Sequence, residues 1–407
     1  MSNLIYFFNI NKFVYYLILL FPIAYISGPF MADLIISIVS VLFIFFLIKK
    51  KIFYIKILQL SLVFWLFIVA SSFWAPNFDK AIISSTSYIR FLLFPFAVAY
   101  FIKDHDKFYF DLSRIIIVII CLIGCDVIFQ NYTGRSISGY PSLNFRNSGF
   151  FGDELIAGGF ITRIFFISLI FFILKKRNLL FFSYSIFVIF IVFLSGERMA
   201  FLLLLLGLFI IPLIFKSNKV KIIFFISLII FIISIFALNE KNKIRMYDNF
   251  INVIKFGVYH DDGTYFKTEK NNLYIINSGW GAHWLAAKNI FIDSPMIGKG
   301  LRSFRFICND KKYETISAND KNRCSTHPHN YHLEILSELG IVGYFLFVSI
   351  IFMYFKLIFK NNDNDHYLLI KFINLLILFW PIAITGSIFS NYFASIIWYI
   401  LAISVFF

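Results

Sequence analysis

Charged residues are scarce in this chain. Only 14% of its 407 residues are Asp, Glu, Lys or Arg, whereas about 25% is usual for a soluble domain. The hydrophobic fraction is 60%, and a globule of this size cannot bury that much apolar surface, which excludes a soluble protein. Disorder is excluded as well, because disordered chains have low hydrophobicity. The composition therefore indicates a polytopic membrane protein.

Two other features are missing from the sequence. The long apolar runs lack the polar–apolar alternation that is typical of membrane barrel strands. No internal repeat of 20 to 50 residues is visible either, which argues against a repeat architecture. The net charge of +15 would suggest a nucleic-acid partner in a soluble chain. Here the basic residues cluster between apolar runs, so we expect no nucleic acid and contact with membrane lipids instead.

The apolar runs predict an all-α, polytopic transmembrane helical bundle. A bilayer core of about 30 Å needs roughly 17–25 apolar residues per helix, and on that basis we expect about twelve spans. They are expected at residues 13–28, 31–48, 57–75, 82–102, 113–130, 157–174, 178–195, 199–215, 222–238, 341–359, 367–386 and 388–407. The chain is thereby divided into residues 1–238 with nine spans, one large loop at 239–340 containing short helices, and residues 341–407 with three spans.

The orientation follows from Lys and Arg in the short connections, which favour the cytoplasmic side. One side carries fifteen of them: Lys12, Lys49, Lys50, Lys51, Lys56, Lys103, Lys107, Lys175, Lys176, Arg177, Lys216, Lys219, Lys221, Lys356 and Lys360. The other side carries four: Lys80, Arg135, Arg146 and Arg198. We therefore expect both termini in the cytoplasm and the large loop on the outer, extracytoplasmic face.

Two cysteines lie within the large loop, at Cys308 and Cys324. If the loop is in an oxidising compartment, a disulfide between them is expected, and two free thiols are the alternative. A helix is expected over residues 281–292, ending before Pro295 because proline disfavours helix in the residue that precedes it.

The loop ends in a histidine-rich segment. Thr326 is a plausible helix N-cap, which would place His327 and His329 at the amino end of a short helix that Gly340 terminates. Such a helix end binds phosphate and disfavours imidazolium, so His329 should be neutral and able to accept a proton. One alternative is a solvated cap. The other is zinc held by His327, His329 and His332, but no partner set at a zinc spacing lies elsewhere, so we expect no metal.

Arginines supply the other polar candidates. Arg198 follows Glu197 in a short outer turn and is a functional candidate because an arginine at this depth costs free energy unless it is paired or faces a cavity. A local ion pair with Glu197 is the alternative. Arg146 lies in a Gly-rich outer segment, residues 131–157, which is a further functional candidate. The alternative is an ordinary polar loop, since Gly and Ser there are turn formers.

Further arginines lie inside spans and in the large loop. Arg90 and Arg163 fall inside expected spans and need partners, for which Asp126 is a candidate. Arg302 and Arg305 add positive charge to the outer face, where loop arginines are ordinarily solvated.

These elements resemble the O-antigen ligase and polymerase superfamily of bacterial envelope glycosyltransferases. His329-Asn330, nine residues, and Gly340-x-x-Gly343 match the pattern H-[NSQ]-x9-G-x-x-G. Arg198 with Leu202 matches R-x3-L, and Cys324-Ser-Thr-His-Pro-His-Asn is similar to a motif that one subgroup carries before its last spans. Many members have an arginine shortly before the loop helix, where this chain has Trp280.

The resemblance implies an inverting glycosyltransferase that uses neither metal nor other cofactor. The donor would be a glycan on undecaprenyl diphosphate at the periplasmic face of the bacterial inner membrane. A ligase transfers it to lipid A–core, whereas the alternative, a polymerase, transfers it to a second lipid-linked glycan. A flippase for the same glycan is a weaker interpretation, because transporters show repeated halves and this chain shows none.

The resemblance also implies roles for particular residues. His329 would take the proton of the acceptor hydroxyl, with Arg198 as the second catalytic residue. The residues that would bind the diphosphate are Arg146, Arg198 and Arg302. The residues that would support the site are Glu197, His327 and Asn330.

Overall fold

The chain is described by a computed structural model that covers residues 2–47, 55–103, 105, 107–248, 251, 258–259, 265–266, 276, 278–317, 319–360 and 365–405. Parts of the expected loop 239–340 and the basic cluster at Lys49, Lys50 and Lys51 lie outside these residues.

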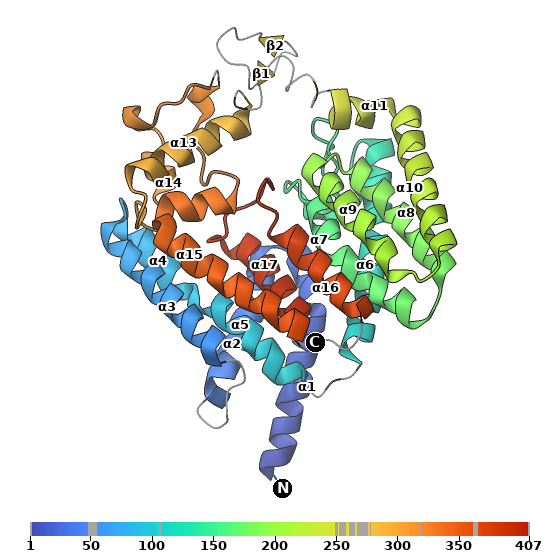
Figure 1. Cartoon of the computed structure of the whole chain (residues 1–407), viewed down its shortest axis with the longest axis horizontal. Helices are drawn as coiled ribbons and strands as arrows, with labels where there is room; N and C mark the ends of the chain where they lie inside the picture. The colour runs from blue at the N-terminus through green and yellow to red at the C-terminus, as the bar shows by residue number, and fades with distance from the viewer. Residues whose placement is uncertain are drawn as a thin grey trace.

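Most of the described residues are helical (Figure 1). The α-helices before the expected loop are α1 (Ser2–Ile26), α2 (Pro29–Leu47), α3 (Ile55–Ser71), α4 (Phe78–Ser87), α5 (Ile89–Ile102), α6 (Phe108–Thr133), α7 (Ala157–Leu174), α8 (Asn178–Leu194), α9 (Arg198–Ile210) and α10 (Asn218–Leu238). Those that follow are α11 (Glu240–Lys243), α13 (Gly279–Asp293), α14 (Phe304–Ile307), α15 (Tyr331–Lys360), α16 (Asp365–Leu378) and α17 (Asn391–Val405).

Shorter elements complete the chain. They are η1 (Ser72–Trp74), η2 (Gly149–Phe151), η3 (Ile211–Ile214), the π-helical turn η4 (Ile244–Asp248), η6 (Lys311–Tyr313) and η7 (Asp320–Asn322). Two strands of two residues each, β1 (Val258–Tyr259) and β2 (Tyr265–Phe266), pair antiparallel with Val258 opposite Phe266.

Seven helical segments among the described residues are long and apolar enough to cross a membrane. They are residues 29–46, 55–74, 78–102, 108–133, 157–174, 218–238 and 331–360. Shorter apolar helices lie at residues 10–26, 178–194, 198–214, 366–378 and 391–405. The predicted helical, multi-pass architecture is therefore confirmed, while the count of twelve spans and the division into three regions stay predictions.

Helices α7, α16 and α17 lie in the middle of the bundle in Figure 1. On one side are α3 and α4 with α13, α14 and α15, and on the other are α6, α8, α9, α10 and α11. α7 contacts both α6 and α16, and α17 contacts α5. The cavity described below lies where α7 and the start of α17 meet the segments that precede α9 and α15.

Helix α15 is broken at Gly340, where the backbone leaves helical geometry at φ 65° and ψ −167°. The break leaves N–H groups without intrahelical acceptors. Backbone carbonyls of the residues before Gly298 act as the acceptors instead. The Ile341 N–H donates to the Pro295 carbonyl at 2.8 Å, and the Val342 N–H donates to the Met296 carbonyl at 3.1 Å. The expected helix end at Gly340 is therefore present, but a second helix continues directly from it.

Helix α16 ends at Leu378 instead of continuing to residue 386 as expected for span eleven. Pro381 disfavours helix in the residue before it, and residues 379–390, called here the irregular segment, contain no regular helix. Its backbone is bonded elsewhere: the Thr385 N–H donates to the His329 carbonyl at 2.9 Å. Asn330 Nδ2 also donates to the Pro381 carbonyl at 2.8 Å. Irregular backbone inside a protein is stable when its polar groups are satisfied in this way.

Replacing Gly340 by alanine should destabilise the protein more than the same change at Gly139. Both glycines have positive φ, so each alanine adds backbone strain, and at Gly340 the combination of φ 65° and ψ −167° is essentially restricted to glycine. A Cβ at Gly340 would also lie 2.4 Å from backbone atoms of Met296, whereas one at Gly139 would meet nothing within 4 Å. Thermal unfolding of the purified variants in detergent measures the difference. Equal shifts in the two midpoints would show that the close backbone approach at Gly340 contributes nothing.

Candidate functional site

A cavity of about 560 Å³ brings together residues that are far apart in the sequence. Its wall includes Arg146, Glu197, Arg198, Arg302, His327 and His329 among the residues singled out from the sequence. Arg163, Arg245, Arg305 and Trp280 line it as well. The structure therefore brings most of the candidate residues together around one cavity. Asn330, Cys308 and Cys324 do not line it.

Asn330, rather than Thr326, caps the helix that follows the histidine-rich segment. Its side-chain oxygen accepts a hydrogen bond from the Leu333 N–H at 3.0 Å. The backbone carbonyl of Asn330 accepts one from the Glu334 N–H at 2.9 Å. His329 has φ 54°, a left-handed conformation that a helix cannot contain. The predicted start of the helix was therefore wrong, and His327 and His329 precede it.

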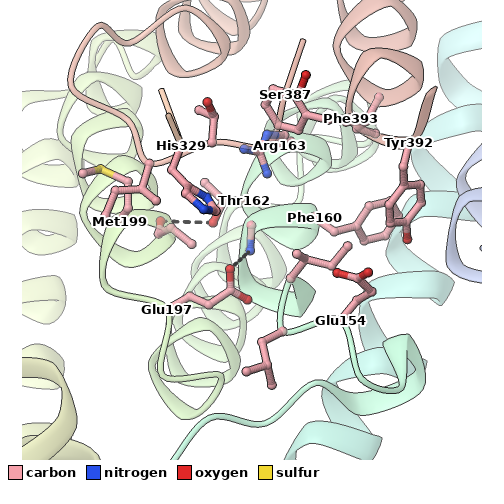
Figure 2. A pocket seen from close by; sticks show the side chains of 18 of the residues that line it. Glu154, Phe160, Thr162, Arg163, Glu197, Met199, His329, Ser387, Tyr392 and Phe393 are labelled. Atoms are coloured by element: carbon pink, nitrogen blue, oxygen red, sulfur yellow. Dashed lines mark hydrogen bonds between the residues drawn. The ribbon is translucent and has the colours of Figure 1, made fainter. Parts of the chain in front are cut away.

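The His329 ring points into the cavity (Figure 2). It lies 4.2 Å from the His327 ring and 5.3 Å from the His283 ring, measured between centroids. Burial, followed by the neighbouring His327 and His283, lowers the pKa of His329 to about 3. The imidazole is thus neutral, as expected, but burial is the main cause and not the helix terminus.

His327 is held by the irregular segment. Its Nε2 lies 3.3 Å from the Thr385 carbonyl, and burial lowers its pKa to about 4 despite that contact. His332, the third histidine of the zinc alternative, lies within α15 with Nδ1 3.2 Å from the Tyr344 hydroxyl. Over the described ranges, no three His, Cys, Asp or Glu side chains converge as metal ligands do.

Arg198 and Arg245 are linked through backbone carbonyls at one end of the cavity. Arg198 Nε donates to the Arg245 carbonyl at 2.9 Å, and Arg245 Nε donates to the Gly196 carbonyl at 3.4 Å. Burial, then the like charges of Arg198 and Arg146, lower the pKa of Arg245 to about 10. Sequence reasoning missed Arg245, because it ends a polar run after α10 that has the composition of an ordinary surface turn.

Arg146 reaches the same end of the cavity from the outer segment 131–157. One of its terminal nitrogens donates to the Leu155 carbonyl, while its Nε is buried without a hydrogen-bond acceptor among the described residues. Burial lowers the pKa of Arg146, and Glu197 opposes that shift. The guanidinium is therefore only partly satisfied by the protein.

Glu197 is held by the amino end of α7. Its carboxylate accepts hydrogen bonds from the Gly158 N–H at 2.6 Å and the Gly159 N–H at 3.2 Å. Burial raises its pKa, and Arg146 and the Gly158 N–H act in the opposite direction. These two N–H groups of the helix start are thus occupied by a carboxylate of the chain itself.

Arg302 and Arg163 line the cavity in different ways. The Arg302 guanidinium donates to Ser84, to Ser387 and to the Phe389 carbonyl, so it fixes the irregular segment. The Arg163 guanidinium lies 5.3 Å from the Phe393 ring centroid and points into the cavity (Figure 2).

Asp126 is not the ion-pair partner that the sequence suggested. It accepts a hydrogen bond from the Ile137 N–H at 2.7 Å. Arg90 instead pairs with Asp33 at 2.7 Å. The mistake arose because Asp33 lies at the start of another helix, and only the folded bundle brings that helix beside Arg90.

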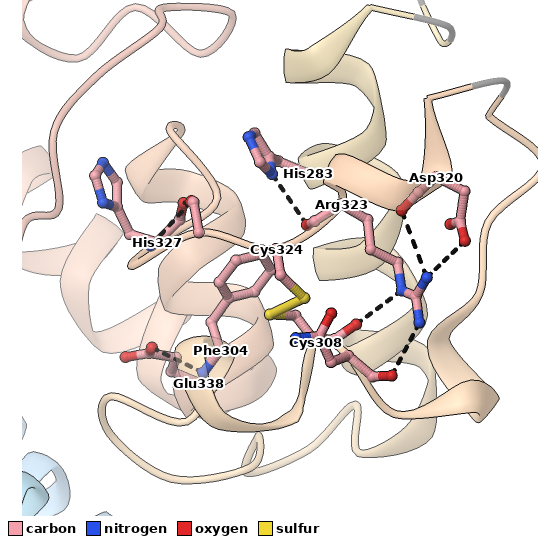
Figure 3. The surroundings of a disulfide bond; sticks show 10 residues. His283, Phe304, Cys308, Asp320, Arg323, Cys324, His327 and Glu338 are labelled. Atoms are coloured by element: carbon pink, nitrogen blue, oxygen red, sulfur yellow. Dashed lines mark hydrogen bonds and ion pairs between the residues drawn. A yellow bond between two sulfur atoms is a disulfide. The ribbon is translucent and has the colours of Figure 1, made fainter.

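Cys308 and Cys324 are joined directly behind the histidine-rich segment (Figure 3). Arg323 reinforces the same connection, since its guanidinium donates to the Cys308 and Asn309 carbonyls, each at 2.9 Å. His283 Nδ1 donates to the Arg323 carbonyl at 3.0 Å. The segment that carries His327 and His329 is therefore anchored to α13 and α14 before it enters the cavity.

Comparison with known proteins supports the family resemblance. A family model described as O-antigen ligase matches residues 183–348, a stretch that contains Arg198, Arg245, Trp280 and His329. A Rickettsia conorii protein provisionally named a polysaccharide ligase is 32% identical over 90 residues. That match covers 22% of this chain and 22% of the relative. The resemblance to the O-antigen ligase family is thereby confirmed.

We predict that Cys308 and Cys324 resist alkylation until the protein is reduced. Protein denatured in SDS exposes all four cysteines, so only a covalent bond would protect this pair. Mass spectrometry after labelling, with and without prior reduction, would identify the modified peptides. Cys121 and Cys125 are free thiols in the structure and serve as internal controls that should react in both samples. Complete labelling of Cys308 and Cys324 without reductant would contradict the pairing.

Proposed function

We propose that the protein is a membrane glycosyltransferase of the O-antigen ligase type. It transfers a polysaccharide from undecaprenyl diphosphate to lipid A–core, with inversion at the anomeric carbon, at the periplasmic face of the inner membrane. The observation that carries the proposal is the cavity, in which a neutral His329 imidazole and a group of arginines face one space. A general base and an anion site are what such a reaction requires.

Arg146, Arg198 and Arg245 form the proposed diphosphate site. A guanidinium binds phosphate oxygens through two parallel hydrogen bonds, and partial burial strengthens the attraction. Negative charge grows on the leaving diphosphate as the bond between the anomeric carbon and oxygen breaks. Arginines placed beforehand stabilise that charge in the transition state. Arg302 contributes by positioning, because its donors already hold the irregular segment.

His329 is the proposed general base. Its ring accepts the proton of the acceptor hydroxyl while that oxygen attacks the anomeric carbon from the side opposite the diphosphate. The pKa of about 3 belongs to the cavity without an anion in it. A bound diphosphate would favour imidazolium and raise that pKa toward a useful range. Proton transfer is thus coupled to donor binding, and the empty enzyme keeps His329 as the free base.

The remaining supporting residues hold this geometry. The Asn330 side chain caps α15 and donates a hydrogen bond to the Pro381 carbonyl of the irregular segment. The His327 ring contacts the Thr385 carbonyl of the same segment. Glu197 balances part of the positive charge while it is fixed to α7. Each of these contacts acts on the position of His329 or of the arginines.

A lipopolysaccharide gel from a strain that lacks the gene tests the proposal. Core without polysaccharide, together with accumulation of lipid-linked polymer, is the expected result. Core carrying a single repeat unit would instead indicate a polymerase, and an unchanged gel would contradict both activities. Complementation with wild type should restore the ladder, whereas His329→Ala should not. His105→Ala is the matched control, because His105 does not line the cavity.

Arg198→Lys and His329→Ala should separate donor binding from chemistry. Lysine keeps the charge but loses the planar fork, so donor affinity and turnover should both fall. His329→Ala should lose about 10²–10⁴-fold in turnover while donor binding is retained, because the base acts only on the acceptor hydroxyl. Donor affinity and turnover of the purified variants in lipid are the measurements. Near-normal turnover of His329→Ala would remove the histidine from the mechanism.

A further inference from the structure

Trp280 presents an aromatic surface to the cavity. It lies in the first turn of α13, which Ser278 caps by accepting a hydrogen bond from the Gly281 N–H at 3.0 Å. The residue is 39% exposed although it belongs to the cavity wall. Most of the Trp280 side chain is therefore packed against the protein, and the remaining surface is open to a ligand.

The indole is oriented by His329. The two ring centroids are 4.6 Å apart and the ring planes are inclined by 71°, so the rings meet edge to face. This geometry leaves at least one face of the indole without a stacked histidine. The next ring on the same helix, His283, is farther away at 6.2 Å. Because Trp280 and His329 line the same cavity, a flat molecule on an open face of the indole would occupy the space that the imidazole also faces.

We propose that Trp280 is the platform on which a sugar ring of the acceptor stacks. The inference rests on the proposed function, for which it defines the acceptor side of the site. One face of a pyranose carries C–H groups with partial positive charge, and the face of an indole is electronegative, so the two surfaces attract each other and exclude water. Stacking there would bring a hydroxyl of the same sugar to the base. The diphosphate needs no such surface, since it is bound by guanidinium groups.

This assignment separates the two substrates. The donor's phosphates would be recognised at the end of the cavity that Arg146, Arg198 and Arg245 form, and the acceptor's sugar at the wall that Trp280 and His329 form. Loss of the indole should weaken acceptor binding and leave donor binding unchanged. A positioning effect on His329 alone would instead lower turnover without changing acceptor affinity.

Tryptophan fluorescence of the purified full-length protein gives a direct test. The chain has six tryptophans, and the difference between wild type and Trp280→Phe isolates the signal of Trp280. Lipid A–core from the deletion strain should change that signal saturably, and lipid A without core sugars should not. In Trp280→Ala the affinity for lipid A–core should fall about 3- to 10-fold, the range expected for one aromatic contact. Trp284→Phe is the matched control, since Trp284 lies one turn further along α13 and does not line the cavity.

The outcomes distinguish this inference from the proposed function. If wild type binds lipid A–core and Trp280→Ala binds it equally well, the platform is wrong while the ligase proposal stands. If undecaprenyl phosphate, the donor-side probe, produces the Trp280 signal and lipid A–core does not, the indole contacts the donor lipid and the inference is overturned. If wild type shows no affinity for lipid A–core, the acceptor of the proposed function is itself wrong.

Discussion

The site depends on a break in one helix. At Gly340 the N–H groups of Ile341 and Val342 lose their helical acceptors, and inside an apolar bundle each would be costly to leave unpaired. The carbonyls of Pro295 and Met296 accept hydrogen bonds from them. In return, the N–H groups of Lys299 and Gly300 donate to the carbonyls of Ser337 and Glu338 in α15. These four hydrogen bonds fasten the disulfide-containing segment to α15. Together with the hydrogen bonds that Asn330 and Thr385 make across the irregular segment, they fix the position of the histidines relative to Arg302.

The two buried carboxylates of α15 extend the same connection. Glu338 accepts the Arg302 N–H at 2.7 Å and thereby holds a residue whose φ of 63° is unfavourable outside glycine. Glu334 accepts the Ile388 N–H at 3.0 Å and also bonds Ser387. One helix therefore positions the turn that carries Arg302 and the irregular segment that contacts His327. The cavity wall is assembled by backbone groups and carboxylates, most of which do not face the cavity themselves.

The helices and several of the candidate residues were predictable from sequence, because long apolar runs and arginines at membrane depth have direct physical consequences. Arg198 was singled out as an arginine at membrane depth, His329 as part of the histidine-rich segment, and both by the family resemblance; they do face one cavity. What could not be predicted was set by contacts distant in sequence. The Asn330 side chain, which caps α15, is held by the irregular segment. Arg90 pairs with Asp33, which belongs to another helix. Arg245 reaches the cavity from a polar run that has no recognisable pattern. Pro381 is a local sign that α16 ends early. The sequence is apolar on both sides of it, so a continuous span was predicted instead.

Among the described residues, six arginines and two glutamates line the cavity, and this excess of positive charge has a kinetic consequence. Under the proposed function, the donor arrives as a diphosphate with its outer phosphate esterified to sugar. After transfer, that phosphate is the terminal phosphate of the carrier diphosphate, and it carries additional negative charge near neutral pH. The spent carrier lipid is thus attracted to the guanidinium groups more strongly than the donor was. The positive charges of the cavity would then slow the release of the spent carrier lipid and not the transfer of the glycan.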